Sequence, residues 1–148
     1  MGVVTATTGT RALGVDLGER RIGLALSDPS RTVASPHDVL RRSGDPVVDR
    51  RAIVDRARDA GANVIVVGLP LSLSGHDGPA AKAARKEVEA IRSVSGDIEV
   101  VMHDERLTTI TAERALNEAR MSRDARRKVV DKVAAAVMLQ AWLESVQS

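Results

Sequence analysis

One stretch of the chain, NVIVVGLP at residues 63–70, is apolar almost throughout and ends at a glycine and a proline. A run this short favours a strand over a helix, and a strand covered on both faces is apolar at nearly every position. Helical patterns lie on either side of it, over residues 46–60 and 79–94, and they are closed by Gly61 and Gly96. Asp45-Pro46 predicts the start of the first helix, because it is a cap residue followed by proline at the first helical position. Strands that alternate with helices are typical of parallel βαβ units. The run therefore predicts an α/β fold with this strand at the centre of the sheet.

The residues before and after this unit predict further strands. Residues 12–17 and 22–26 are short apolar segments separated by the turn residues 18–20, which is typical of a β-hairpin, and residues 31–42 can add a third strand. Residues 97–107 form an apolar segment after the second helix. This order predicts a mixed five-stranded sheet, made of an antiparallel three-strand meander plus a βαβαβ unit, with helices on both faces.

Two helices are expected after the last strand, one opened by Thr108 or Thr109 and one over residues 123–146. The apolar residues of the second recur at helical spacing and define its buried face: Val130, Val133, Ala134, Val137, Met138, Ala141 and Trp142. Asp131 falls within this arc, so we expect it to point toward the edge of the core. Leu139 is expected on the opposite side, exposed or against a partner.

Length and composition are those of an ordinary globular protein. The 148 residues fit one domain, residues 11–148, behind a flexible tail at residues 1–10. The absence of cysteine excludes disulfides, zinc–thiolate sites and cysteine nucleophiles. There is no apolar run long enough to span a membrane and no signal-peptide pattern. We therefore expect a cytoplasmic protein with no membrane partner.

Positive charge gathers in clusters although the net charge is only +2. The clusters are Arg41 with Arg42, Arg50 with Arg51, Arg120 with Arg123, and residues 126–128. They can hold phosphates, although solvated helix faces are an equally good interpretation. The chain has no Phe or Tyr and a single Trp142, so it lacks the rings on which single-strand binders stack bases. A nucleic-acid partner is therefore expected to be held by its backbone.

Acidic residues fall where two of the predicted strands end. Asp16 lies near the end of the first strand, and Asp104 and Glu105 follow the last one. These acids have ordinary interpretations: Asp16 caps the hairpin turn, and the other two cap the next helix and pair with Arg106. However, a half-buried carboxylate is costly without a hydrogen bond, a cation or a metal, and function in open α/β sheets concentrates beyond the carboxyl ends of strands.

Asp131 brings a further acid from the last helix. A cap or a salt bridge to Lys128 or Lys132 is one interpretation, and a metal or a shared cationic site is another. Acids on three separate elements that reach one edge of a sheet can bind Mg²⁺ or Mn²⁺, because hard cations prefer oxygen ligands. Two such ions about 3.5–4 Å apart can activate a water and stabilise the leaving oxygen of a phosphodiester. The acids therefore predict metal-dependent phosphoryl chemistry.

Four segments in this order resemble the YqgF family, also called RuvX, of ribonuclease H-like proteins: GVDLGERRIGLALSD, VVGLPLSLSG, DERLTT and VDKVAAAVMLQAWL. The resemblance covers nearly the whole chain. It implies a ribonuclease H-like fold, a cytoplasmic metal-dependent nuclease, and a substrate that is either the 5′ end of the 16S ribosomal RNA precursor or a four-way (Holliday) DNA junction. Position by position, it implies that Asp16, Glu105 and Asp131 are the catalytic, metal-binding acids. Lys132 departs from the family, whose members often carry isoleucine or serine there.

Residues beside the acids are predicted to bind substrate. The arginines would hold phosphate oxygens, and the threonines are helix caps whose amides can also bind phosphate. These residues are Arg20, Arg21, Arg106, Thr108 and Thr109. Each has an ordinary alternative, as a surface arginine paired with a neighbouring acid or as a cap alone.

Two other functions stay open at this point. The fold can serve a non-catalytic factor that binds ribosome-associated RNA, although three retained acids argue against it. The hairpin also resembles the phosphate loop of actin-like ATPases and sugar kinases, but 148 residues lack the second domain that closes over the nucleotide. Contacts to the phosphate backbone of a nucleic acid do not distinguish RNA from DNA. Paired cuts in a junction would require a symmetric homodimer, whereas trimming an RNA end would not.

Overall fold

The computed structural model describes residues 10–69, 78–104 and 123–147. Its centre is a mixed sheet with the strand order β3-β2-β1-β4-β5. The strands are β1 (Arg11–Leu17), β2 (Arg21–Ser27), β3 (Ala34–Arg41), β4 (Ala62–Leu69) and β5 (Glu99–Asp104). β1 to β3 form an antiparallel meander, while β4 pairs in parallel with both β1 and β5. The predicted five-stranded α/β sheet is confirmed.

The first two strands form the predicted hairpin. Its turn is closed by a hydrogen bond of 3.0 Å from the Gly18 amide to the Arg21 carbonyl. In the register of the sheet, Asp16 is the Cα partner of Gly23, and Arg21 is the partner of Arg41. The end of the meander that carries the turn therefore brings an acid and several arginines close together.

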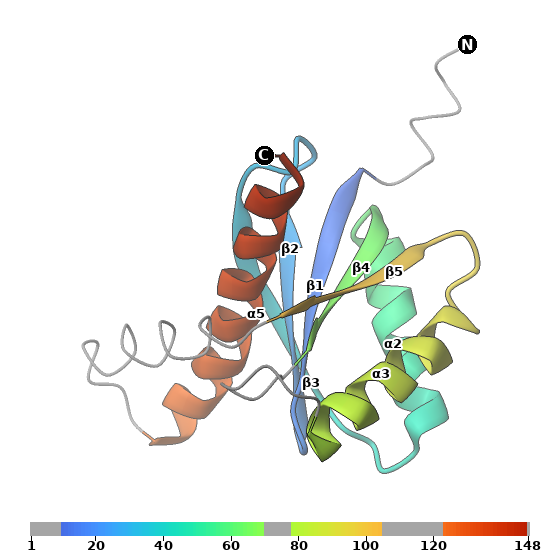
Figure 1. Ribbon diagram of the computed structural model, residues 1–148. Coiled ribbons are helices and arrows are strands. Elements are labelled where there is room, and N and C mark those ends of the chain that lie inside the picture. Colours follow the sequence, from blue (N-terminus) through green and yellow to red (C-terminus); the bar gives the residue numbers. More distant parts are fainter. Residues whose placement is uncertain (1–9, 70–77, 105–122, 148) are drawn as a thin grey trace.

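Helices cover both faces of the sheet (Figure 1). α2 (Pro46–Asp59) and α3 (Pro79–Arg92) pack on one face, and α5 (Arg123–Gln147) packs on the other. Alternate strand residues supply the two cores. The core under α2 and α3 includes Leu13, Val15, Ile22, Leu24, Ile65, Val67 and Val100. The core under α5 includes Ala12, Ala25, Val64, Val66, Ala135, Leu139 and Leu143.

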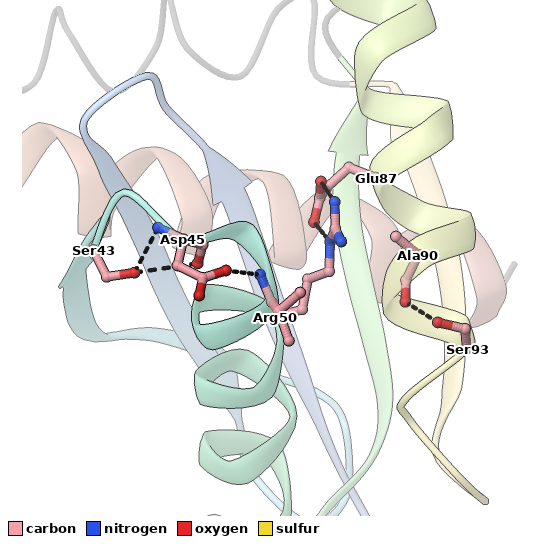
Figure 2. A network of polar contacts seen from close by, with 7 residues as sticks. Ser43, Asp45, Arg50, Glu87, Ala90 and Ser93 are labelled. Atoms are coloured by element: carbon pink, nitrogen blue, oxygen red, sulfur yellow. Dashed lines mark hydrogen bonds and ion pairs between the residues drawn. The ribbon is translucent and has the colours of Figure 1, made fainter.

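The first helix begins where Asp45-Pro46 predicts. The Asp45 carboxylate accepts a hydrogen bond of 3.0 Å from the Val47 amide, and proline lies in the first turn, where its missing amide costs nothing. Figure 2 shows this cap beside a two-pronged ion pair from Arg50 on α2 to Glu87 on α3, with distances of 2.7 and 3.0 Å. The pair ties together the two helices that cover the same face.

The orientation of the last helix differs from the prediction at Leu139. This side chain is fully buried, whereas Val137, expected to face inward, is only partly buried. The buried stripe passes through Ala135, Leu139 and Leu143. Alanine and valine lie on several sides of this helix. Periodicity alone therefore placed the centre of the buried face wrongly. The prediction that Met138 is buried is confirmed.

Some predicted segments lie outside the described residues. These are nearly all of the predicted N-terminal tail, most of the loop after β4, and the helix opened by Thr108 or Thr109. Within the described part of the chain, every helix is too short or too polar to cross a membrane.

Candidate functional site

Asp16 lies on the face of β1 that α5 covers. Side chains alternate along a strand, and on β1 Leu13 and Val15 belong to the core under α2 and α3. Ala12 belongs to the core under α5, and Gly14 lies against Leu139 of that helix. Asp16 continues the second set, and its side chain is half-buried. The predicted acid of the first strand therefore points to the α5 side of the sheet.

Two glycines let α5 lie directly on the sheet. A Cβ atom built on Gly14 would come within 2.9 Å of the Leu139 Cβ. On Gly23 it would come within 2.0 Å of the backbone carbonyl oxygen of Asp131. Only a residue without a side chain permits such an approach. Because Gly23 is also the cross-strand partner of Asp16, the backbone of Asp131 lies over the immediate neighbour of Asp16.

The Asp131 carboxylate is paired with Arg21. The Arg21 Nε donates to the Asp131 Oδ2 at 2.6 Å, and the two side chains are 27% and 23% exposed. Arg21 lies on the same face of β2 as Gly23, two residues away, so the arginine reaches the helix from the sheet. A charge-assisted hydrogen bond of this length holds both side chains in place. The alternative of a salt bridge from Asp131 to Lys132 is not the pairing that forms.

A polar groove of about 970 Å³ begins beside this pair. Arg21 and Lys132 line it, and so do Arg20, Arg41 and Arg42. The prediction assigned Arg20 and Arg21 to substrate binding. It named Arg41 with Arg42 only as a basic cluster able to hold phosphates, and Lys132 only as a cation that could lie beside the metal site, turned away from Asp131 by helical spacing. A basic pair at residues 41–42 was visible in the sequence, whereas its position opposite Arg21 depends on the register of β2 and β3.

Comparison with known proteins gives the family. Residues 10–145 match the family model of RuvX, which is described as a Holliday junction resolvase. The chain belongs to the RuvX family. Curated relatives from Pelotomaculum thermopropionicum and Rhodococcus opacus are each 42% identical to this RuvX chain, over 91% and 90% of its length and 87% and 77% of theirs. Both carry the name "Putative pre-16S rRNA nuclease".

Solved structures that resemble this RuvX chain share its fold. RuvC of Thermus thermophilus in complex with Holliday junction substrate aligns with a TM-score of 0.56 and 13% identity, over 94% of this chain and 96% of that one. The yeast mitochondrial Holliday junction resolvase Ydc2 aligns with a TM-score of 0.53 and 13% identity, over 92% and 79% of the two chains. The predicted ribonuclease H-like fold is thereby confirmed.

The described part of this RuvX chain contains half of the predicted site. Asp16 and Asp131 come to one face at one end of the meander, with Arg21 on Asp131 and Arg20 exposed at the hairpin turn. The other predicted residues, Glu105, Arg106, Thr108 and Thr109, lie outside the described residues. Among the residues that are described, no three or more acids and histidines form a cluster that could hold a metal ion.

Proposed function

We propose that this RuvX chain is a metal-dependent endonuclease that hydrolyses phosphodiester bonds, with Asp16, Glu105 and Asp131 as its catalytic acids. The observation that carries the proposal is the contact of Asp131 with Gly23, because Gly23 is the cross-strand partner of Asp16. Two carboxylates from elements far apart in the chain thus share one face. A function would explain why acids from distant elements are brought to the same face.

Strand alternation supports Glu105 over Asp104 as the third acid. On β5, Val101 packs on the α5 side, whereas Val100 and Met102 pack on the opposite side. Odd-numbered positions of this strand therefore share the face of Asp16. Glu105 has this parity and directly follows the strand in the sequence.

The donor set suits Mg²⁺ or Mn²⁺. Carboxylate oxygens are the ligands that these hard cations prefer, and the Asp131 carboxylate already accepts a cationic partner, Arg21, at 2.6 Å. Asp16, Asp131 and Glu105 would hold one or two ions, which supply an activated water and neutralise charge on the phosphate during hydrolysis. Asp16, fixed on a strand, would set the position of the group.

The neighbouring residues would bind the substrate phosphates. Arg20 and Arg21 flank the acids on the hairpin, and a guanidinium can hold two phosphate oxygens at once. We assign Arg106, Thr108 and Thr109 the same role, because they come shortly after Glu105 in the sequence. Arg106 carries a guanidinium, and the amides of a helix that starts at the threonines, as the sequence predicts, would bind anions.

The substrate would be structured nucleic acid in the cytoplasm. The names of the curated relatives support processing of the 5′ end of pre-16S rRNA, and the family description supports resolution of four-way junctions. The second activity would require a symmetric homodimer, because a junction is resolved by two paired cuts.

The test replaces Asp16 by asparagine, which keeps the size of the side chain and removes its charge. Cleavage of labelled pre-16S rRNA and of a four-way junction is measured in Mg²⁺ or Mn²⁺, with binding titrations in EDTA and melting curves. We expect Asp16→Asn to lose cleavage by at least about a hundredfold while its folding and binding persist. Exposed Asp55 on α2 offers the matched control, Asp55→Asn, which should cleave like the wild type.

Wild-type cleavage by a folded Asp16→Asn protein would contradict the proposal. Wild-type protein that binds the RNA and cleaves neither substrate would favour the non-catalytic binding factor. ATP hydrolysis in a parallel assay would favour the ATPase interpretation. Equal loss of melting temperature and of binding in Asp16→Asn would make Asp16 a structural residue.

A further inference from the structure

The groove beside Arg21 and Asp131 extends well beyond the acids. Its walls come from the β1–β2 turn, β3, the loop before α2, the first turn of α2, and α5. Arg41 lies on the face of β3 that carries Val39, and Val39 pairs with Gly23. Arg41 is therefore two residues beyond the row of Asp16 and Gly23, on the same side of the sheet. A ligand at the acids that also reaches Arg41 would continue along this groove.

The groove carries an excess of positive charge. Five cations line it, Arg20, Arg21, Arg41, Arg42 and Lys132, against three acids. Two of the acids are engaged by the protein itself. Asp38 accepts a hydrogen bond from Arg56, which lowers the pKa of Asp38, and buried Asp49 accepts one from the Ser43 amide at 3.0 Å.

Most of the cations are available to a ligand. Among the described residues, Arg20, Arg41 and Lys132 have no carboxylate within salt-bridge distance. The Arg42 Nε donates to the Gly18 carbonyl at 2.6 Å, which fixes the guanidinium against the turn without neutralising it. A backbone hydrogen bond of 2.9 Å, from the Arg42 amide to the Arg20 carbonyl, holds the backbones of the two arginines beside each other. The sheet and its β1–β2 turn therefore set the backbone positions of the arginines, and α5 sets that of Lys132.

The chemistry of the groove fits a nucleic-acid backbone and not bases. No aromatic side chain lines it, and the one tryptophan of the chain, Trp142, packs against the core under α5. Single strands are held largely by stacking on aromatic rings, whereas a duplex hides its bases and presents a rigid row of phosphates. Arg21 and Arg42, whose guanidinium groups are held by hydrogen bonds, suit such a row, because they lose little side-chain freedom on binding.

We propose that this groove binds the sugar–phosphate backbone of a duplex segment that flanks the scissile phosphodiester, with Arg41, Arg42 and Lys132 as contacts outside the catalytic site. The inference rests on the proposed function, because it takes the acids as the place of cleavage. It adds a requirement for an RNA substrate: the cleaved strand should lead into a double-stranded region, as it does in every arm of a four-way junction. Lys132, where the resemblance indicates isoleucine or serine in other members, would supply one of the contacts.

The test measures binding in EDTA, where cleavage plays no part. The double variant Arg41→Gln/Lys132→Gln is titrated by fluorescence anisotropy against a DNA duplex, an RNA duplex and the corresponding single strands over a series of salt concentrations. The matched control, Arg51→Gln/Lys86→Gln, removes the same residue types from exposed positions on α2 and α3. Melting curves establish that both variants fold.

We expect the double variant to bind at least one of the two duplexes about tenfold more weakly. The slope of log affinity against log salt should become shallower by about two, one for each lost phosphate contact. The control should bind like the wild type. Wild-type duplex binding by the double variant, an equal loss in the control, or an equal loss for single strands would overturn the inference.

The result can be separated from that of the Asp16→Asn experiment. A chain that cleaves nothing but loses duplex affinity in the double variant would contradict the proposed nuclease and keep the groove as a duplex site. Asp16-dependent cleavage together with unchanged duplex affinity in the double variant would support the proposed nuclease and contradict the groove as a duplex site.

Discussion

Arg21 connects the acids to the groove. Its guanidinium lies 2.6 Å from the Asp131 carboxylate, and it belongs to the residues that line the groove. Both side chains are about a quarter exposed, so the pair is screened less than a surface salt bridge but is not fully buried. The arginine therefore balances the charge of Asp131 at the place where we propose that a metal ion binds.

Replacing Arg21 by glutamine should change both stability and metal response. We expect Arg21→Gln to unfold about 1 kcal/mol more easily, because Asp131 loses its counter-charge. We also expect Mn²⁺ to raise the melting temperature more than in the wild type, since no cation has to leave Asp131. Differential scanning fluorimetry with and without Mn²⁺ measures both effects, with Arg51→Gln as the control. Equal Mn²⁺ shifts in wild type and variant would argue against competition.

The Asp28 carboxylate has a structural role, because it accepts hydrogen bonds from the loop that follows β2. The Ser30 hydroxyl, the Val33 amide, and the hydroxyl and amide of Thr32 hydrogen-bond it and lower its pKa. A carboxyl with a lowered folded pKa stabilises the protein fully above its unfolded pKa of about 3.9. This contribution is lost as the pH falls through that value toward the folded pKa.

The pH dependence of stability should reveal this role. We expect Asp28→Ala to melt below the wild type at about pH 7 and the difference to shrink as the pH is lowered to about 3, because the Asp28 carboxylate of the unfolded chain takes up a proton in this range while that of the folded protein stays ionised. Thermal melts of both proteins over this range provide the measurement. A difference that stays constant with pH would show that the charge of Asp28 is not responsible.

At the scale of secondary-structure elements, the contact of α5 with the β1–β2 hairpin builds the candidate site. Gly14 and Gly23 lie on adjacent strands, and both let the helix backbone or its Cβ atoms come closer than any other residue would. The stripe that begins at Asp131 continues through Ala135 and Leu139 at steps of four residues. The packing that buries Leu139 therefore also brings Asp131 to the sheet.

Gly23→Ala should disrupt this contact. The new Cβ would lie 2.0 Å from a backbone oxygen of α5, so the whole helix would have to shift. We expect a loss of about 3 kcal/mol of unfolding free energy, at the upper end for overpacking, together with loss of cleavage. Urea denaturation measures the first effect. Gly78→Ala is the control, because it has open space around it and should cost at most about 1 kcal/mol as an N-cap change. Wild-type stability of Gly23→Ala would contradict the close packing.

At the scale of the molecule, the sheet separates the larger apolar core from the face that carries the candidate site. The core under α2 and α3 is larger and draws on all the described strands except β3 for its fully buried residues. The core under α5 is built mostly from small residues, and Asp16 and Asp131 lie at the end of that face. The Arg50–Glu87 pair joins the helices on the first face (Figure 2). One face thus supplies most of the apolar packing, while the other holds the helix that carries Asp131.

Much of this architecture follows from local features of the sequence. The apolar run at residues 63–70 predicted β4, and Asp45-Pro46 predicted the start of α2, because strand alternation, capping and proline geometry are properties of a few neighbouring residues. The positions of Asp16 near a strand end and of Asp131 on an inward helix face were predicted in the same way. The assignment of the whole chain to one domain stays a prediction.

Contacts between distant residues were decided only by the tertiary structure. Arg21 and Asp131 are 110 positions apart, and their pairing depends on how α5 crosses the hairpin. Arg41 and Lys132 join the same groove because of strand register and helix placement, and the burial of Leu139 depends on the missing side chain of Gly14. Periodicity shows that a helix has an apolar side, but on a helix rich in small apolar residues it does not fix which stripe meets the sheet. That choice is made by the shape of the partner surface, where two glycines leave room for the backbone.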